Sequence, residues 1–326
     1  MHWTHSLGEI GLERISAALP GLNWDNVINF KVILLSIVLE ALPFVLLSVI
    51  VSAFLHNFVS DDFIRRIIPK SKLLSIVPAA FLGILFPVCD CGMVPIVRRL
   101  VMKGVPLHAA VSFMLAAPII NPVVTAATAF AFKANMNMVV FRLGTALFTA
   151  CFSGWLISIL FKSDELKSAA HTHHHGCGCA EHDDDFPSAR PSFADKLLRT
   201  VYDASNEFFE MGKYLILGAI MGALAQIVIP RVLLLAVGQN PVLSIGVMML
   251  FAFVISVCSA ADAFIAASFV TSFSPGSLIA FMVFGPMIDL KNILMLLHSF
   301  RARFVLSLVA AVVFSCTVSA YLINHL

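Results

Sequence analysis

The sequence predicts an all-α membrane protein with about eight transmembrane segments in two repeats, some of them broken or re-entrant helices. Three observations lead to this prediction: an apolar composition, a regular succession of long apolar stretches, and a likeness between the two halves of the chain. Of the 326 residues, 60% are hydrophobic and only 12% are charged. In soluble domains about 45–50% of residues are apolar and about 25% are charged. Lipid must therefore solvate much of the apolar surface of this chain.

Apolar stretches long enough to cross a bilayer recur along the whole chain, since one helical span needs about 20 such residues. They run over 30–55, 73–97, 105–132, 138–161, 212–230, 242–272, 276–297 and 304–323. Four of these stretches lie in the first half of the chain and four in the second. We therefore expect a first membrane repeat over 30–162 and a second over 207–326.

The remaining parts of the chain are more polar. Residues 1–29 carry three acidic side chains and lack an uninterrupted apolar core. This predicts an N-terminal segment that lies on the membrane surface, or else a disordered lead-in, rather than a cleavable signal. Residues 163–206 have the biased, polar composition of a flexible linker between the repeats.

Short motifs recur in both halves in the same order and at nearly the same spacing. The matched pairs are 86–92 with 255–261, Pro106 with Pro275, 117–121 with 285–289, and Glu40 with Glu210. An internal duplication explains this agreement. Duplicated halves around a central site are typical of transporters.

Prolines interrupt several of the predicted spans. They are Pro78, Pro87 and Pro95 in the second span, Pro118 and Pro122 in the third, and Pro286 in the seventh. Proline removes a backbone donor, and in lipid the freed carbonyl must face protein or water. Broken helices at matching places indicate a binding site near the membrane midplane. Kinked helices without a ligand are the alternative.

A Cys-x-Cys motif lies inside one of these interrupted spans. Cys89 and Cys91 would point apart on a helix but to one side of an extended chain, and the neighbouring prolines and Gly92 favour an unwound chain. Thiolates select Cu(I) and also bind Zn(II), and trivalent arsenic is likewise thiol-seeking. Cys258, the counterpart of Cys89, could supply a third thiolate, and Asp90 suits a proton-linked step. Buried packing and a redox disulfide are the alternatives.

Other polar residues fall in or near the apolar stretches. Asp289, with Lys291, is expected at the tip of a broken helix, where backbone and charge can meet a solute. Glu40, Glu210 and Asp262 are candidates for a proton relay. For the two glutamates, a place at the membrane interface beside a helix N-terminus is an equal alternative.

The linker carries a second metal-binding signal. Its candidate ligands are His171, His173, His174, His175, Cys177, Cys179 and His182. Imidazole and thiolate groups at short spacing suit Zn(II) or copper, and a flexible chain can wrap around an ion. We expect a bound Zn or Cu ion here and no required cofactor elsewhere.

Several functions are disfavoured by the sequence. It contains no Gly-x-x-x-x-Gly-Lys, His-Glu-x-x-His or Gly-x-Ser-x-Gly motif, so none of the corresponding enzyme activities is expected. The net charge of +2 and the lack of a basic tract argue against a nucleic-acid partner. Cys151 and Cys316 lie among apolar neighbours and are expected to serve only in packing.

The motifs around Cys89–Pro95 and Ala117–Pro122 resemble the predicted-permease family of bacterial inner-membrane proteins, which includes ArsP-type organoarsenical efflux permeases. The His-rich central loop is similar to a branch regarded as copper/zinc efflux transporters. The resemblance implies a multi-pass permease of the bacterial inner membrane. It would export a soft metal or metalloid ion by secondary active transport.

By match to the family motif, Cys89, Cys91 and Asn121 are the implied site positions. The second half departs from the motif, because Ser259 and Ala260 replace the aspartate and the second cysteine. The residues leave two other functions open, a membrane thiol oxidoreductase and a metal-sensing membrane protein. Expected partners are the ion, the bilayer and further copies of the chain.

The basic loops give a test of the predicted re-entrant segment. Loops 56–72 and 98–103 are both rich in Lys and Arg, and both should therefore be cytoplasmic. A hairpin over 73–97, folded at 89–92, would place both loops on one side. We expect cysteines introduced at Ser60 and Gly104 to react with an impermeant thiol reagent from the same side, and labelling from opposite sides would rule out the hairpin.

Overall fold

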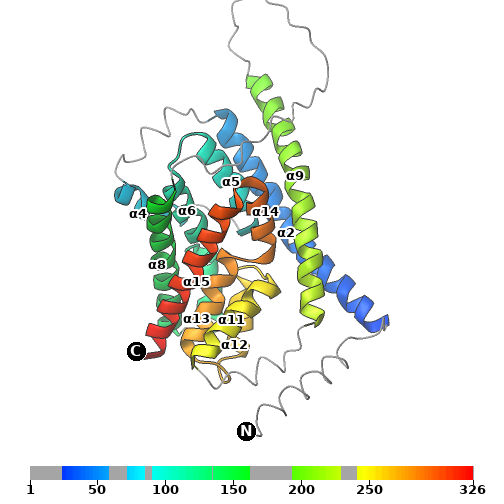
Figure 1. The fold of residues 1–326 in the computed structure, drawn as a ribbon. Coiled ribbons are helices and arrows are strands. Elements are labelled where there is room, and N and C mark those ends of the chain that lie inside the picture. Colours follow the sequence, from blue (N-terminus) through cyan, green and yellow to red (C-terminus); the bar gives the residue numbers. More distant parts are fainter. Residues whose placement is uncertain are drawn as a thin grey trace, which may run out of the picture.

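The computed structural model describes residues 24–58, 72–84, 90–133, 135–161, 193–228 and 241–325. Its helices are α2 (Trp24–Phe58), α4 (Lys72–Leu82), α5 (Asp90–Met102), α6 (Leu107–Ala116), α7 (Pro122–Ala131), α8 (Met136–Leu160), α9 (Phe193–Val228), α11 (Pro241–Ile255), α12 (Ala261–Ser268), α13 (Pro275–Met287), α14 (Leu290–Ser299) and α15 (Ala302–His325). All secondary-structure elements in these ranges are helices (Figure 1), which confirms the all-α prediction.

The eight predicted segments correspond to four single helices and four broken pairs. Within the described ranges the single helices are α2, α8, α9 and α15, and the pairs are α4–α5, α6–α7, α11–α12 and α13–α14. Four stretches are long and apolar enough to cross a membrane: Ile28–Ala53, Met136–Leu160, Pro275–Ser299 and Ala302–His325. The chain is a multi-pass membrane protein.

Two predicted segments lie largely outside the described residues. They are the N-terminal surface segment over 1–29 and the linker over 163–206, including all of its candidate metal ligands. Residues 193–206 are expected to belong to a flexible linker, but they are helical, because α9 already begins at Phe193.

The two halves repeat one helix order and run in opposite directions. Figure 1 shows α2 and α9 side by side and antiparallel, with α2 ending at the upper end of the bundle, where α9 begins. The last helices of the halves are antiparallel as well: Thr149 of α8 meets Cys316 of α15 at 3.8 Å, while the rings of Phe161 and Phe304 lie 5.7 Å apart. The chain is therefore an inverted repeat.

Each half contains a re-entrant hairpin. In the first half, Ser75 in the first turn of α4 hydrogen-bonds to Nε2 of His108 in the first turn of α6, at 3.0 Å. In the second half, the hydroxyls of Ser244 in α11 and Ser277 in α13 are 2.6 Å apart. The chain between each pair must leave one end of the bundle and return to it. Both bonds join residues 33 positions apart, as expected for a duplication.

Proline is an incomplete guide to the breaks between half-helices. Pro78 and Pro95 lie within α4 and α5, so the expectation that they interrupt a helix is wrong. Pro122 starts α7, a position where its missing N–H costs nothing. The break between α11 and α12 contains no proline and instead has Ser256 in the left-handed region, with φ 52.

Close helix crossings hold the longer helices against the half-helices. A β-carbon on Gly154 of α8 would meet Ser112 of α6, and one on Gly276 of α13 would meet the carbonyl of Ala320 in α15. The backbone N–H of Gly276 also donates to Oδ1 of Asn324 at 2.8 Å. These contacts require residues without a β-carbon, because backbone atoms on the partner helix cannot move aside.

Replacing Gly276 by alanine should therefore lower stability by about 1–3 kcal/mol through overpacking. Gly246→Ala in α11 is the matched control, because nothing lies within 4 Å of a β-carbon there and alanine is the better helix former. Thermal unfolding in detergent would measure both variants. Equal stability of the two would contradict the close crossing.

Candidate functional site

A small cavity lies where α2, α5, α14 and the break between α11 and α12 meet. Its polar lining consists of Glu40, Asp90, Cys258 and Lys291, and the rest is apolar surface of α2. Its volume of about 20 Å³ is enough for a single water-sized occupant. The first half supplies Glu40 and Asp90 and the second supplies Cys258 and Lys291, so the cavity lies between the repeats.

Lys291 is held in place by hydrogen bonds and by an ion pair. Its Nζ donates to the carbonyl of Ser256 at 2.7 Å and lies 3.6 Å from Oδ2 of Asp289. The same carboxylate accepts from the hydroxyl of Ser256 at 2.6 Å. The buried ammonium group is thus neutralised within its own half, which lets it line the cavity without a bound anion.

Every half-helix that follows a break carries an oxygen ligand at its N-terminus. Asn121 caps α7 by accepting from the N–H of Val123 at 2.8 Å, and Asp289 caps α14 by accepting from that of Asn292 at 2.6 Å. Asp90 and Asp262 lie in the first turns of α5 and α12. These groups compensate the positive ends of the half-helix dipoles. Of these four residues, only Asp90 lines the cavity. Lys291, two positions after Asp289, lines it as well, whereas Asn121 does not.

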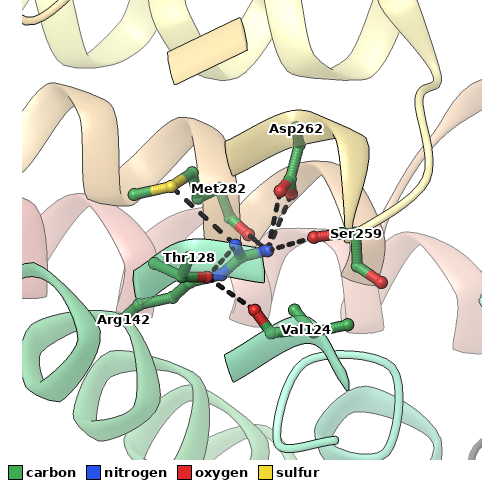
Figure 2. Close-up of polar contacts among 6 residues, drawn as sticks. All are labelled: Val124, Thr128, Arg142, Ser259, Asp262 and Met282. Atoms are coloured by element: carbon green, nitrogen blue, oxygen red, sulfur yellow. Dashed lines mark hydrogen bonds and ion pairs between the residues drawn. The ribbon is translucent and has the colours of Figure 1, made fainter. Parts of the chain in front are cut away.

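A buried arginine that the sequence analysis did not single out joins the two halves (Figure 2). Nη2 of Arg142 in α8 contacts both carboxylate oxygens of Asp262 at 2.9 Å and donates to the carbonyl of Ser259 at 2.9 Å. It also donates to the carbonyl of Met282 at 3.1 Å, and Nη1 donates to the hydroxyl of Thr128 at 2.8 Å. Asp262 is therefore engaged in an ion pair, and its relay role stays a prediction.

The sequence contained a signal for this residue. Arg142 is the only charged residue in the predicted span 138–161. A charge inside an apolar span is costly and either functional or paired, so the position could have been identified. Its partner could not, because Asp262 lies 120 residues away.

The two glutamates that match in sequence have different surroundings. Glu40 lines the cavity. Glu210 lies at 2.7 Å from Nε2 of His298 and 3.7 Å from Arg98, with 43% of its side chain exposed. Their common role as proton relays stays a prediction. Of the two glutamates, only Glu40 lines the cavity.

The Cys-x-Cys pair is only partly described. Cys89 and the side chain of Cys91 lie outside the described residues, while the backbone of Cys91 belongs to α5. The expectation that the chain is unwound at Cys91 and Gly92 is therefore wrong, because the helix already begins at Asp90. The cysteines described as free thiols are Cys151, Cys258 and Cys316. In the described part of the chain, no group of three or more His, Cys, Asp or Glu side chains is arranged to hold a metal ion. The convergence of the thiols stays a prediction.

Comparison with known proteins places this fold among membrane permeases. The profile of the family ArsP_1, described as "Predicted permease", matches residues 26–325. The chain is 45% identical over 289 residues to "UPF0718 protein YcgR" of Bacillus subtilis, which covers 89% of this chain and 95% of the relative. It is 38% identical over 285 residues to a "Putative two-component membrane permease complex subunit" of Streptococcus mutans, covering 87% and 91%. No solved structure matches the chain.

The buried ion pair gives a stability prediction. Arg142→Met or Asp262→Leu alone leaves an unpaired charge in the interior, which should cost about 3–5 kcal/mol. The double variant removes both charges and should be clearly more stable than either single variant, as measured by thermal unfolding in detergent. The partly exposed pair of Arg98 and Glu210 is the control, since breaking it by Arg98→Met should cost clearly less, about 1 kcal/mol. Additive losses in the double variant would show that the two charges do not stabilise each other.

Proposed function

From the premise that the chain belongs to the ArsP_1 family of predicted permeases, we propose that it exports a thiophilic metal or metalloid ion through the cavity between its hairpins. Family membership makes the protein a membrane permease and not an enzyme. The thiol oxidoreductase is therefore set aside. The substrate class, the direction of transport and the role of the Cys-x-Cys motif are our proposals.

The observation that carries this proposal is the cavity to which both inverted halves contribute. Asp90 from the first hairpin and Cys258 from the second line it together. In transporters with inverted repeats, a site between the halves can open to either side as one half moves against the other. A water-sized cavity of about 20 Å³ suits an ion better than a larger solute.

The chemistry of the lining favours a soft ion. Cys258 contributes one sulfur, and Cys89 and Cys91 flank Asp90 in the sequence. Three thiolates suit Cu(I), Zn(II) or trivalent arsenic. Thiols must lose their protons to bind such an ion, so its release would be accompanied by proton uptake. Asp90 and Glu40 line the same cavity and would accept or supply those protons.

We further propose that the permease lies in the bacterial inner membrane and that the linker over 163–206 delivers ions to the transport path. The Streptococcus mutans relative is named as a subunit of a two-component complex. A second subunit, or another copy of the chain, could accordingly assemble with this protein.

Serine substitution of Cys89 and Cys91 tests the transport site. The double variant should abolish resistance of cells to thiophilic ions, because serine oxygen binds them far more weakly than thiolate. Purified protein in vesicles, screened with Zn, Cu and As(III), would measure transport directly. Cys151→Ser is the matched control and should retain activity, because that thiol lies in the middle of α8 and away from the cavity. Undiminished resistance of the double variant at normal expression would reject the site.

Deletion of residues 171–182 separates a permease from a metal sensor. A permease should keep part of its transport in vesicles, because the path through the membrane repeats is intact. A sensor would lose its whole response to metal in cells. Complete loss of transport by a well-folded deletion variant would contradict a mere delivery role for the linker.

A further inference from the structure

A second cavity adjoins the first and has a different lining. Asp90 lines both cavities. The second cavity lies between α5, α6 and the junction of α13 and α14, and its volume is about 10 Å³. That is close to the minimum for one water molecule, so only a single small species fits.

Three methionines line this second cavity. They are Met93, Met114 and Met287, and the residues are 1%, 6% and 3% exposed. Each comes from a different helix, namely α5, α6 and α13. Thioether sulfur is a soft ligand that suits Cu(I), whereas Zn(II) in proteins is bound by thiolate, imidazole and carboxylate groups.

Oxygen acceptors complete the lining and distinguish it from ordinary methionine packing. Asn292 lines the cavity and is 4% exposed, and its Oδ1 is buried without a hydrogen-bond partner in the described part of the chain. A buried acceptor without a partner costs about 1–3 kcal/mol. A bound cation or a water donor would remove that cost, and a purely apolar filling would not.

The residue that follows the duplicated segment 86–92 differs in kind from its counterpart in the second half. Continuing the match of 86–92 with 255–261 pairs Met93 with Asp262. In the second half this position forms the ion pair with Arg142. In the first half it presents a thioether to the cavity. Among the described residues, the charge pair with Arg142 thus belongs to the second hairpin.

We propose that the second cavity is a binding subsite for a monovalent soft cation, Cu(I) or its analogue Ag(I), held by the three thioethers with oxygen from Asn292 and Asp90. This inference rests on the proposed function and narrows its substrate to a monovalent thiophilic cation. Because Asp90 also lines the first cavity, the ion can pass between thiol and thioether ligands beside one carboxyl group.

The test is a titration of the full-length protein in detergent, labelled with ¹³C in its methionine methyl groups. Ag(I) is the probe, since it mimics Cu(I) without redox chemistry. About one equivalent should shift the methyl signals of Met93, Met114 and Met287, assigned through single leucine variants. Zn(II) should leave these signals in place. Because the thiols of the linker and of the first cavity also bind Ag(I), the titration is repeated with Cys89, Cys91, Cys177, Cys179 and Cys258 changed to serine.

A pair of triple variants provides the matched comparison. In the same serine background, M93L/M114L/M287L keeps the apolar volume and should lose the bound Ag(I) that metal analysis finds after desalting. M211L/M248L/M295L changes three methionines that are as deeply buried but do not line the cavity, and it should retain the ion. If the first triple variant fails to fold, the methionine shifts in the protein with all its methionines still show whether the subsite binds Ag(I).

The outcomes separate this inference from the proposed function. Absence of the three shifts, shifts only at other methionines, or equal shifts with Zn(II) would overturn the thioether subsite. Transport of Zn or As(III) in vesicles would then leave the proposed function standing. Shifts at the three methionines without transport of any thiophilic ion would support the subsite and refute the proposed export of such an ion.

Discussion

The constraint on which the structure depends is that backbone polar groups inside a bilayer must be paired within the protein. A broken helix exposes such groups in the middle of the membrane, and this chain has a break in each of four helix pairs over its described residues. Side-chain oxygens meet that requirement at the new N-termini. Asp289 is the clearest case, because one fully buried carboxylate caps α14, accepts from Ser256 and pairs with Lys291.

Pairing at the breaks also explains why charges can be present in the interior. Lys291 enters the cavity with its charge balanced by Asp289, and Arg142 is balanced by Asp262. Both ion pairs also contact the break between α11 and α12, so the tip of the second hairpin is fixed without a bound ligand. The cavity beside it is lined by a thiol and carboxyl groups, which are the groups that the proposed proton-linked transport of a soft ion would use.

The inverted repeat is symmetric in its helices but not in its chemistry. Both hairpins are closed by a hydrogen bond between the same pair of first turns, yet only the second is anchored by the buried arginine. The first carries the Cys-x-Cys motif and the thioether side chain of Met93. In the proposed transport by alternating access, the anchored second half and the first half would move against each other.

The sequence by itself determined the membrane location, the helical segments, the duplication and the hairpin over 73–97, because hydrophobic length and repeated motifs are local properties of the chain. Breaks are expected in the matched segments 86–92 and 255–261. The second segment contains the break between α11 and α12, whereas residues 90–92 belong to α5, and Pro78 and Pro95 lie inside helices. Only the tertiary structure decided that the halves are inverted and which side chains meet. The partners in the ion pair and in both cavities come from distant elements, and packing, rather than local sequence, selects among them.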